Sequence, residues 1–354
     1  MKIIHCADIH LGSKLESKFP KEKSDIRRIE VLNTFNRMID YANDNGIKII
    51  ILSGDVFDKD KPKTKDKENF YKAIEMNPQI DFLYLKGNHD KDGAYLGSDF
   101  ANLKRFDKEN FTSYEYDGVC ISGIEMDQSN AKTFYSQLSL DKNKLNIVML
   151  HGDVTDSVGM DKVKIDMLKN KGIDYLALGH IHSYKYGKID DRGIYAFSGC
   201  LEGRGFDETG EKGFIELDVT DKIAYKFIPF ASRTIYDVDV DITGCSDLYD
   251  IKTKVTEAVK DIDKENILRI NLVGEVSVDT DFNEKDIEVH LSKYFFVDVK
   301  NKTTIKLNVD DYNDDKSLIG EFIRGVYNNN EYSDEEKQKI VSMGLRLISG
   351  KEVE

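Results

Sequence analysis

Short apolar runs alternate with longer amphipathic stretches over the first 230 residues of the chain. The runs are rich in Ile, Leu and Val and stop at a glycine or a polar residue, which predicts buried strands at 2–6, 47–54, 80–87, 145–150 and 173–178. One amphipathic stretch, residues 25–45, has helical spacing in its apolar side chains, which are Ile29, Leu32, Phe35, Ile39 and Ala42. Strands that alternate with helices predict a layered α/β/β/α sandwich.

The pattern changes twice further along the chain. Hairpin-like strands are expected at 184–190, 193–199, 213–219 and 223–230, and a small α+β unit follows Pro229. Two helical patterns come last, and the second begins at Ser333 and Glu336, which have the spacing of a capping box. We therefore expect a first domain at 1–232, a small α+β domain at 233–313 and a C-terminal helical segment at 314–354.

Composition and charge bear mainly on the partners of the protein. No run approaches the roughly 20 apolar residues of a membrane span, and the four cysteines form no CxxC, so we expect a cytoplasmic protein with reduced thiols. A net charge of −14 argues against a general nucleic-acid binder. However, residues 234–354 carry 16 Lys and Arg against 27 Asp and Glu, a net charge of −11, which leaves only −3 for residues 1–233. The acidity therefore does not exclude DNA binding by the first domain.

Histidines, carboxylates and an asparagine follow the ends of five expected strands. In strand order they are Asp8 and His10; Asp55; Asn88 and His89; His151; and His180 and His182. These positions hold five of the seven histidines in the chain. Because the carboxyl ends of strands in an α/β sheet converge on one crevice, we expect these side chains to meet there.

This mixture of side chains suits a particular kind of metal site. Imidazoles together with carboxylates favour Mn, Fe or Zn, whereas an all-oxygen site favours Mg or Ca. A carboxylate shared by two cations holds them about 3.5–4 Å apart, where they can position a phosphoryl group and activate a water. A single D-x-H pattern is weak evidence, but five fragments at successive strand ends predict a two-metal phosphoesterase site.

The fragments D-x-H, G-D, G-N-H-D, H-G-D and G-H-x-H, in this order, resemble the calcineurin-like metallophosphoesterase superfamily over about residues 1–230. HCADIHLG, GDVFDKDKP, GNHDKDG, GHIHSYKYG and SGCLEGRGFDETGEKG further resemble the SbcD-like branch, the nuclease subunits of DNA double-strand-break repair complexes. The resemblance implies the metallophosphoesterase sandwich, with residues 233–313 in the place of the capping domain of that branch.

The resemblance also implies a role for each site residue. One metal would be held by Asp8, His10, Asp55 and His182, and the second by Asp55 again with Asn88, His151 and His180. His89 would be catalytic, stabilising the transition state and either protonating the leaving oxygen or orienting toward it. Asp90 and Asp153 would orient imidazoles by accepting their other N–H.

Several residues have a second interpretation. Lys59, Lys61 and Lys63 begin a row of alternate lysines that would follow a phosphate backbone, or would simply be solvated. Arg204 would reach a phosphate, or form an ion pair with Glu202 or Asp207. His5 lies within a strand and favours packing over metal binding. Asp58 has either a turn role or a contact with substrate.

The function implied is a metal-dependent DNA nuclease that acts on DNA ends in repair, using two divalent ions, with Mn for activity and Fe or Zn as alternatives. A homodimer and a coiled-coil ATPase partner of the SbcC type are also implied. The amphipathic segment 333–348 would bind the ATPase, or would simply pack within the protein. Two other functions stay open, a phosphodiesterase for nucleotides or small molecules and a mainly structural subunit of an ATPase complex.

Overall fold

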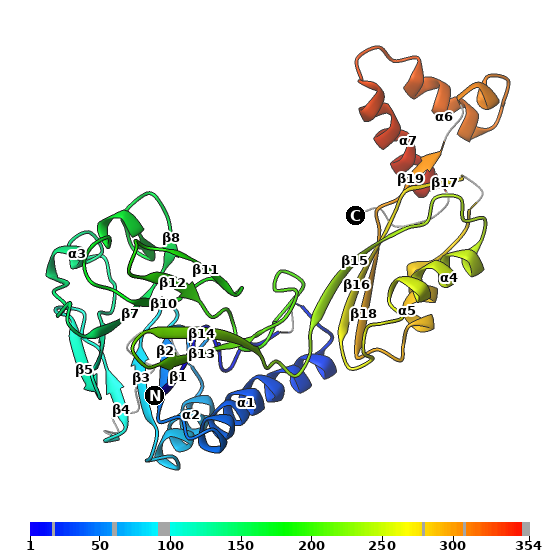
Figure 1. Ribbon diagram of the computed structural model, residues 1–354. Coiled ribbons are helices and arrows are strands. Elements are labelled where there is room, and N and C mark those ends of the chain that lie inside the picture. The colour runs from blue at the N-terminus through cyan, green and yellow to red at the C-terminus, as the bar shows by residue number, and fades with distance from the viewer. Residues whose placement is uncertain (16–17, 59–61, 91–99, 278–279, 307–308, 349–354) are drawn as a thin grey trace. The chain divides into compact units, whose positions relative to one another are not determined.

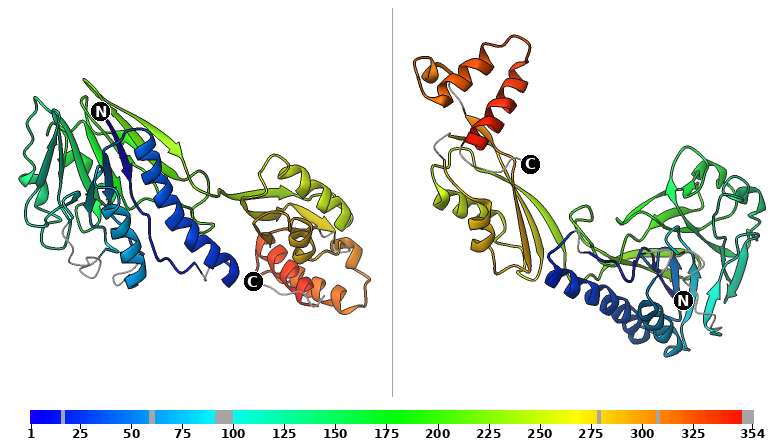
Figure 2. Two further views of the ribbon diagram at one scale, coloured as in Figure 1. Left: turned by 90° about the horizontal axis from the view of Figure 1, so that it is seen from below. Right: turned by 180° about the vertical axis from the view of Figure 1, so that it is seen from behind.

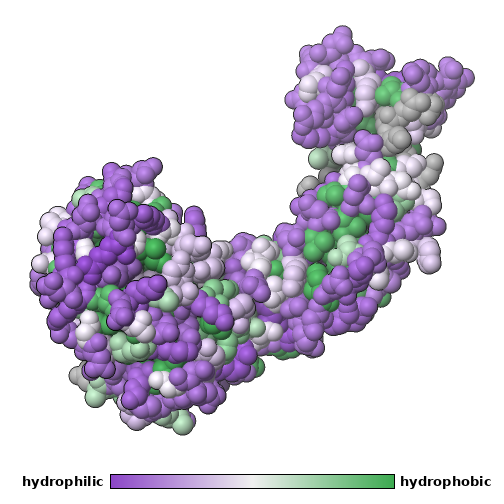
Figure 3. Space-filling model, in the orientation of Figure 1, coloured by the Kyte–Doolittle hydropathy of each residue, from purple (hydrophilic) through white to green (hydrophobic). Residues whose placement is uncertain are grey.

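The computed structural model describes residues 1–15, 18–58, 62–90, 100–277, 280–306 and 309–348. The chain divides into two compact units, residues 1–234 and 235–354. Within the described ranges, no helix is long and apolar enough to cross a membrane. The face of the molecule drawn in Figure 3 is mainly hydrophilic, with small apolar patches between the polar areas.

The first unit contains two six-stranded sheets (Figure 1). The first sheet has the order β14-β13-β1-β2-β3-β4; its strands are β14 (Ile223–Pro229), β13 (Gly213–Val219), β1 (Lys2–Cys6), β2 (Ile49–Ser53), β3 (Asp81–Leu85) and β4 (Leu103–Arg105). The second has the order β11-β12-β10-β7-β6-β5; its strands are β11 (Lys185–Lys188), β12 (Ile194–Phe197), β10 (Tyr175–Gly179), β7 (Leu145–His151), β6 (Val119–Gly123) and β5 (Thr112–Tyr116). In the first sheet β1, β2 and β3 run parallel, and in the second sheet β12, β10, β7 and β6 do. The carboxyl ends of these strands therefore lie at one end of each sheet.

The two sheets pack face to face, with helices outside them. Ile51 and Leu83 of the first sheet and Ile147 and Ala177 of the second belong to one buried apolar cluster. Helices α1 (Lys21–Asp44) and α2 (Thr64–Glu75) cover the other face of the first sheet (Figures 1 and 2). The outer layer on the second sheet is thinner, with α3 (Phe134–Gln137), the 3₁₀ helix η2 (Ile165–Met167) and loops that include the short strands β8 (Asp153–Val154) and β9 (Lys162–Val163). The predicted α/β/β/α sandwich is confirmed.

Helix α1 corrects one sequence-based expectation. It begins directly after Pro20, and Ile29, predicted to face the core, is 60% exposed. Ile29 is six residues before the buried Phe35, which turns it about 240° around the helix axis and away from the sheet. At that end of the helix the buried side chain is Arg27, whose Nη2 donates to Glu202 Oε2 at 2.8 Å.

The second unit has a parallel three-stranded sheet, β15-β16-β18 (Ile235–Asp241, Ile267–Val273 and Phe296–Asn301). Helices α4 (Leu248–Ala258) and α5 (Glu284–His290) pack on it, and a two-stranded sheet joins β17 (Glu275–Ser277) to β19 (Thr304–Lys306). A 3₁₀ helix, η3 (Val309–Tyr312), precedes α6 (Leu318–Tyr327) and α7 (Asp334–Ile348), which share an apolar cluster. The predicted capping box is confirmed: Ser333 N donates to Glu336 Oε2 at 2.8 Å, and Glu336 N donates to Ser333 Oγ at 3.3 Å.

Candidate metal centre

The loops that follow the central strands meet at one end of both sheets. Asp8 N donates to Gly54 O and His10 N donates to Asp55 O, both at 3.0 Å, so the loops after β1 and β2 run side by side. His180 N donates to both carboxylate oxygens of Asp8 at 3.0 Å, which ties the second sheet to the first. The predicted site residues of five strands therefore lie together, because the two parallel sheets present the same end.

Four of these residues have a backbone conformation that L-amino acids rarely adopt. The φ angles of Asp8, His10 and Asp55 are 52°, and that of His180 is 95°. Left-handed conformations of non-glycine residues are uncommon and unfavourable, and they concentrate at functional sites. The hydrogen bonds between the loops hold this strained arrangement in place.

Glycines next to these residues allow the side chains to approach one another. A Cβ atom on Gly54 would collide with the His151 ring, and one on Gly87 would collide with the Asp55 carboxylate. A Cβ on Gly179 would collide with Ser53 O. Close packing around the site therefore requires glycine at all three strand ends, and at Gly54 the positive φ of 92° requires it as well.

One group of donor atoms comes from both sheets. Asp8, His10 and His182 each offer a ligand atom, and these atoms lie within 4.8 Å of one another. His10 Nε2 is 3.2 Å from His182 Nε2. Ligand atoms bound about 2.1 Å from one cation are themselves about 3.0–3.4 Å apart, so this spacing suits a shared metal ion.

A second group lies beside the first and shares Asp8 with it. Asp8, Asp55 and His151 form this group, with Asp55 Oδ2 3.4 Å from His151 Nε2. Asn88 Oδ1 is 3.1 Å from His151 Nε2 and 3.3 Å from His180 Nδ1. All seven residues predicted as ligands are thus within two adjoining clusters.

Hydrogen bonds to the outer ring nitrogens decide which nitrogen faces the site. His151 Nδ1 donates to Ser53 O at 2.9 Å, and His182 Nδ1 donates to Glu208 Oε1 at 2.7 Å. These bonds leave the Nε2 lone pairs of both rings directed at the clusters. The site therefore brings nitrogen lone pairs close to one another and to carboxylate and amide oxygens, and these repel unless a cation or a proton lies between them. The nitrogens belong to His10, His151 and His182, and the oxygens to Asp55 and Asn88. The donor set therefore fits divalent Mn, Fe or Zn.

Burial and charge shift the protonation of the site in the absence of metal. Burial raises the pKa of Asp8 to about 6 and lowers the pKa of His10 to about 4. Burial also opposes the charge on His151, but the bond to Asp55 outweighs it and raises the pKa of His151 to about 9. Asp55 shows the converse, since burial favours its neutral form while His151 and His10 bring its pKa below the ordinary value. The metal-free site thus favours a protonated His151, and a bound cation would replace that proton.

The loop at residues 200–212 holds His182, a feature that sequence reasoning missed. Besides the bond from the ring to Glu208, Lys212 Nζ donates to His182 O at 2.9 Å, and both Glu208 and Lys212 are buried. The signal was present in the sequence, because both residues lie in the GRGFDETGEKG stretch that supported the resemblance.

Arg204 lies behind the histidines. Its Nη1 donates to Asp58 Oδ1 at 2.9 Å and its Nη2 to Glu208 Oε1 at 2.7 Å. Asp58 Oδ1 is in turn 3.5 Å from His10 Nδ1. One guanidinium therefore joins the carboxylates that face the outer nitrogens of His10 and His182, and its side chain is occupied by contacts within the protein.

The expected ion pair of Arg204 with Glu202 or Asp207 is wrong. Glu202 faces α1, where it accepts hydrogen bonds from Arg27 and Thr34. Asp207 bonds Lys18 at 2.9 Å. The two acids adjacent in sequence point to other elements, so the partners of Arg204 come from Asp58 and Glu208 instead.

Asp90 and Asp153 do not accept the imidazole hydrogen bonds that were predicted for them. Asp90 is buried and accepts from the backbone N–H groups of Val56, Phe57 and Gly87, at 3.0, 2.9 and 3.2 Å. It therefore fixes the loop after Asp55 against the turn after β3. Among the described contacts, the Asp153 side chain makes no hydrogen bond to a ring, although its charge acts to raise the pKa of His180, which burial lowers overall.

His89 and His5 have different surroundings. His89 N donates to Asp55 Oδ1 at 2.9 Å, its Nδ1 donates to Asp58 O at 3.0 Å, and its ring centroid is 5.2 Å from that of His10. His5 is buried between the sheets with Nδ1 2.9 Å from Tyr175 Oη, and burial lowers its pKa to about 3. The expectation that His5 packs in the core is confirmed.

Of the three lysines predicted to contact DNA, the structure describes Lys63. Lys63 is exposed and directly precedes helix α2, whereas Lys59 and Lys61 lie outside the described residues.

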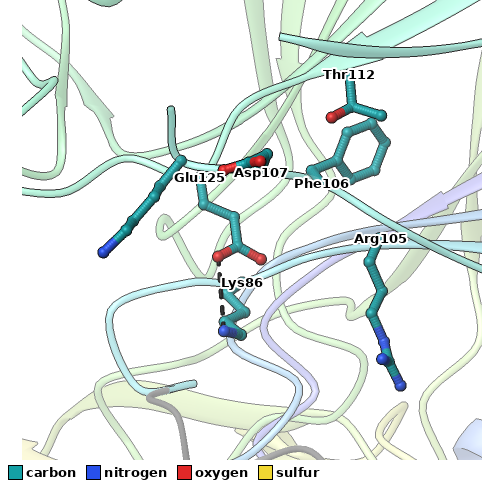
Figure 4. Close-up of a pocket in the computed structure, with 7 residues that line it drawn as sticks. Lys86, Arg105, Phe106, Asp107, Thr112 and Glu125 are labelled. Atoms are coloured by element: carbon teal, nitrogen blue, oxygen red, sulfur yellow. Dashed lines mark ion pairs between the residues drawn. The ribbon is translucent and has the colours of Figure 1, made fainter. Parts of the chain in front are cut away.

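A separate pocket of about 450 Å³ opens at the ends of β3, β4 and β6 (Figure 4). It is lined by Lys86, Arg105, Phe106, Asp107, Lys108, Thr112 and Glu125. Charges of both signs line it, and Lys86 Nζ is 3.6 Å from Glu125 Oε2.

The chain is similar in sequence to several known proteins. The family model for calcineurin-like phosphoesterases matches residues 1–184. DNA double-strand break repair protein Mre11 of Sulfolobus acidocaldarius is 25% identical over 377 residues, which cover 97% of this chain and 94% of the relative. Mre11 of Saccharolobus solfataricus is 26% identical over 300 residues, with 78% and 76% covered. The uncharacterized metallophosphoesterase YhaO of Bacillus subtilis is 28% identical over 247 residues, with 64% and 60% covered.

Proposed function

Because the chain belongs to the calcineurin-like phosphoesterase family, we propose that it is a metal-dependent nuclease that hydrolyses phosphodiester bonds at DNA ends during repair. The observation that carries the proposal is the meeting of Asp8, His10, Asp55, Asn88, His151, His180 and His182 in two adjoining clusters. The similarity to a DNA break repair protein over nearly the whole of both chains favours DNA as the substrate class.

The site residues divide into two sets of ligands in this proposal. Asp8, His10, Asp55 and His182 hold one divalent cation. Asp55 also holds the second, together with Asn88, His151 and His180. Mn is the proposed ion for activity, with Fe or Zn as alternatives. When bound, the two cations supply an activated water and offset the charge of the phosphate oxygens.

The protein itself positions these ligands before any cation arrives. Bonds from His151 to Ser53 and from His182 to Glu208 occupy each Nδ1, so each Nε2 faces the position of a cation. The left-handed backbone of Asp8 and Asp55 aims both carboxylates inward. Little reorganisation of these side chains is then needed when a cation binds.

His89 is the proposed catalytic residue. Its backbone N–H bonds Asp55 and its Nδ1 donates to Asp58 O, so the ring is held beside the clusters. With Nδ1 occupied, the proton to be delivered to the leaving oxygen is carried at Nε2. General acid catalysis of this kind contributes about 10²–10⁴-fold to a rate.

The proposed partners are DNA ends, a second copy of the chain and a coiled-coil ATPase of the SbcC type, with α7 as the segment that binds the ATPase. The exposed Lys63 remains a proposed contact to the phosphate backbone. Arg204 is removed from the proposed DNA contacts, because its guanidinium is engaged by Asp58 and Glu208.

End-labelled double-stranded DNA with Mn²⁺ tests the proposal. Wild type should shorten the DNA, a His89→Gln variant should be at least about 100-fold slower with unchanged Mn²⁺ affinity, and the control His290→Gln should match wild type. His290 is a suitable control because it bonds Thr256 in the second unit. Hydrolysis of bis-p-nitrophenyl phosphate without DNA cleavage would instead support a small-molecule phosphodiesterase. Mn²⁺ binding with neither activity would support a structural subunit.

A further inference from the structure

The edge strands of the two sheets carry the same short pattern of side chains. Tyr184, Lys185 and Tyr186 lie at the start of β11, and Tyr225, Lys226 and Phe227 lie on β14. β11 ends the second sheet and β14 ends the first, at the same end of the sandwich (Figure 1). Both lysines are exposed.

The aromatic rings of the two strands form a continuous row across this edge. Tyr184 stacks on Phe227 with ring centroids 4.6 Å apart and planes 16° apart. Tyr186 is 5.5 Å from Tyr225 and 5.9 Å from Tyr184, and Tyr225 is 6.4 Å from the buried Tyr175. The row thus begins in the core between the sheets and ends at the surface.

Closure of the sandwich explains most of this row but not its outer member. Tyr184, Tyr225 and Phe227 are partly buried and pack against the cluster between the sheets. Tyr186 has the same strand face as Tyr184 but is 55% exposed. A large ring supported by other rings and open to solvent is a platform on which a flat ligand can stack.

The platform is close to the candidate metal centre. Tyr184 follows His182 by two residues, and Tyr186 by four. At about 3.4 Å per residue, the Cα atom of Tyr186 is within about 14 Å of that of His182. That distance corresponds to a few nucleotides along a strand of DNA.

We propose that Tyr186 stacks an unpaired base of a single-stranded DNA segment that leads to the metal centre. Aromatic platforms stack the bases of single strands without sequence preference, because every base offers a ring face. Intact duplex does not offer one, since its bases are stacked on each other. The inference rests on the proposed nuclease function and specifies the substrate as an end with unpaired nucleotides.

The chain contains no tryptophan, which permits a direct test. A Tyr186→Trp variant has a single indole at the platform, and a Tyr249→Trp variant has one on α4, where Tyr249 is 76% exposed. A thymidine oligonucleotide is titrated in EDTA, so that no cleavage occurs. Saturable quenching is expected for the first variant only, and blunt duplex DNA should quench it much less. Tyr186→Ala should weaken binding of the oligonucleotide about 5- to 150-fold, while Tyr186→Phe stays within about twofold.

Equal quenching of the Tyr186→Trp and Tyr249→Trp variants by the oligonucleotide, or no quenching of either, would overturn the inference. Equal quenching by blunt duplex would also overturn it, because the surface would then be a general DNA contact. A lower melting temperature of Tyr186→Ala with unchanged DNA affinity would show a packing role only. The nuclease assay gives a separate result. If wild type cleaves DNA but Tyr186→Trp shows no quenching, the proposed nuclease function stands and the stacking role of Tyr186 is wrong.

Discussion

Glu208 Oε1 accepts a hydrogen bond from His182 Nδ1 at 2.7 Å, across 26 residues of chain. The same oxygen accepts from Arg204 Nη2 at 2.7 Å. Burial acts to raise the pKa of Glu208, but the hydrogen bond from His182 and then the charge of Arg204 outweigh it and hold that pKa below its usual value. Glu208 therefore remains ionised and holds His182 in the tautomer with Nε2 free for a cation.

Replacing Glu208 should weaken metal binding. Without the acceptor, the His182 ring can rotate and change tautomer, and loss of such an outer partner typically costs about 10–100-fold in metal affinity. We expect Glu208→Ala to show this loss for Mn²⁺ by isothermal titration calorimetry, and Glu208→Gln, which keeps an oxygen, to fall between. The exposed Glu211→Ala serves as control. Unchanged Mn²⁺ affinity in Glu208→Ala would contradict the positioning role.

Arg204 should act through the metal centre and not through DNA. Arg204→Gln leaves Asp58 and Glu208 without their shared cation, so Mn²⁺ affinity and stability should both fall. The salt dependence of DNA binding, measured by fluorescence anisotropy, should be unchanged. A slope reduced by about one would instead show a direct phosphate contact. Arg192→Gln, which removes an Asp174 ion pair elsewhere in the same unit, is the matched control.

Alanine substitutions at Gly54 and Gly118 distinguish the effect of backbone strain from that of a steric clash with His151. Both have positive φ, 92° and 85°, so alanine at either position should cost about 1–2 kcal/mol. Only Gly54→Ala also displaces the His151 ring, since nothing lies within 4 Å of the Cβ position at Gly118. Mn²⁺ binding should be lost in Gly54→Ala and kept in Gly118→Ala. Equal Mn²⁺ affinities would show that His151 tolerates the methyl group.

Asp8 should make metal binding dependent on pH. Burial raises its pKa to about 6, so below that pH the carboxyl group is protonated and competes with the cation. The stabilisation of the metal-free fold by the protonated Asp8 is present below about pH 4 and is lost as pH rises through about 6. Metal binding changes in the opposite direction, so the increase in Tm produced by Mn²⁺ should be larger at pH 7 than at pH 5. Equal increases at both pH values would contradict this assignment.

Asp90 and Asp153 should differ in stability effects. Asp90→Asn replaces an oxygen that accepts backbone hydrogen bonds, leaving at least one buried N–H unpaired at a cost of about 1–3 kcal/mol. Asp153→Asn should change the free energy of unfolding much less, because its carboxylate makes no described hydrogen bond of this kind. Urea denaturation of the metal-free variants measures both. A similar loss at the two positions would show that the loop after Asp55 does not depend on Asp90.

Hydrophobic periodicity and the motifs at strand ends are enough to predict the elements and the candidate ligands. The apolar strands at 2–6 and 145–150 agree with β1 and β7 to within one residue, because hydrophobic periodicity depends on local chain geometry. His151 and Asp55 could be predicted as site residues because they follow strands whose carboxyl ends must converge. The capping box at Ser333 was equally visible, since both partners lie within four residues.

The groups that support those ligands could not be predicted, because long-range packing brings them together. Glu208, Asp58 and Arg204 belong to different loops, and no periodicity in the sequence indicates that their side chains meet behind His10 and His182. Asp90 was misassigned for the same reason, since a motif shows the type of residue but not the direction of its side chain. Hydrogen bonds of this kind depend on separations of a few tenths of an ångström between distant segments, and those separations are set by the packing of two sheets.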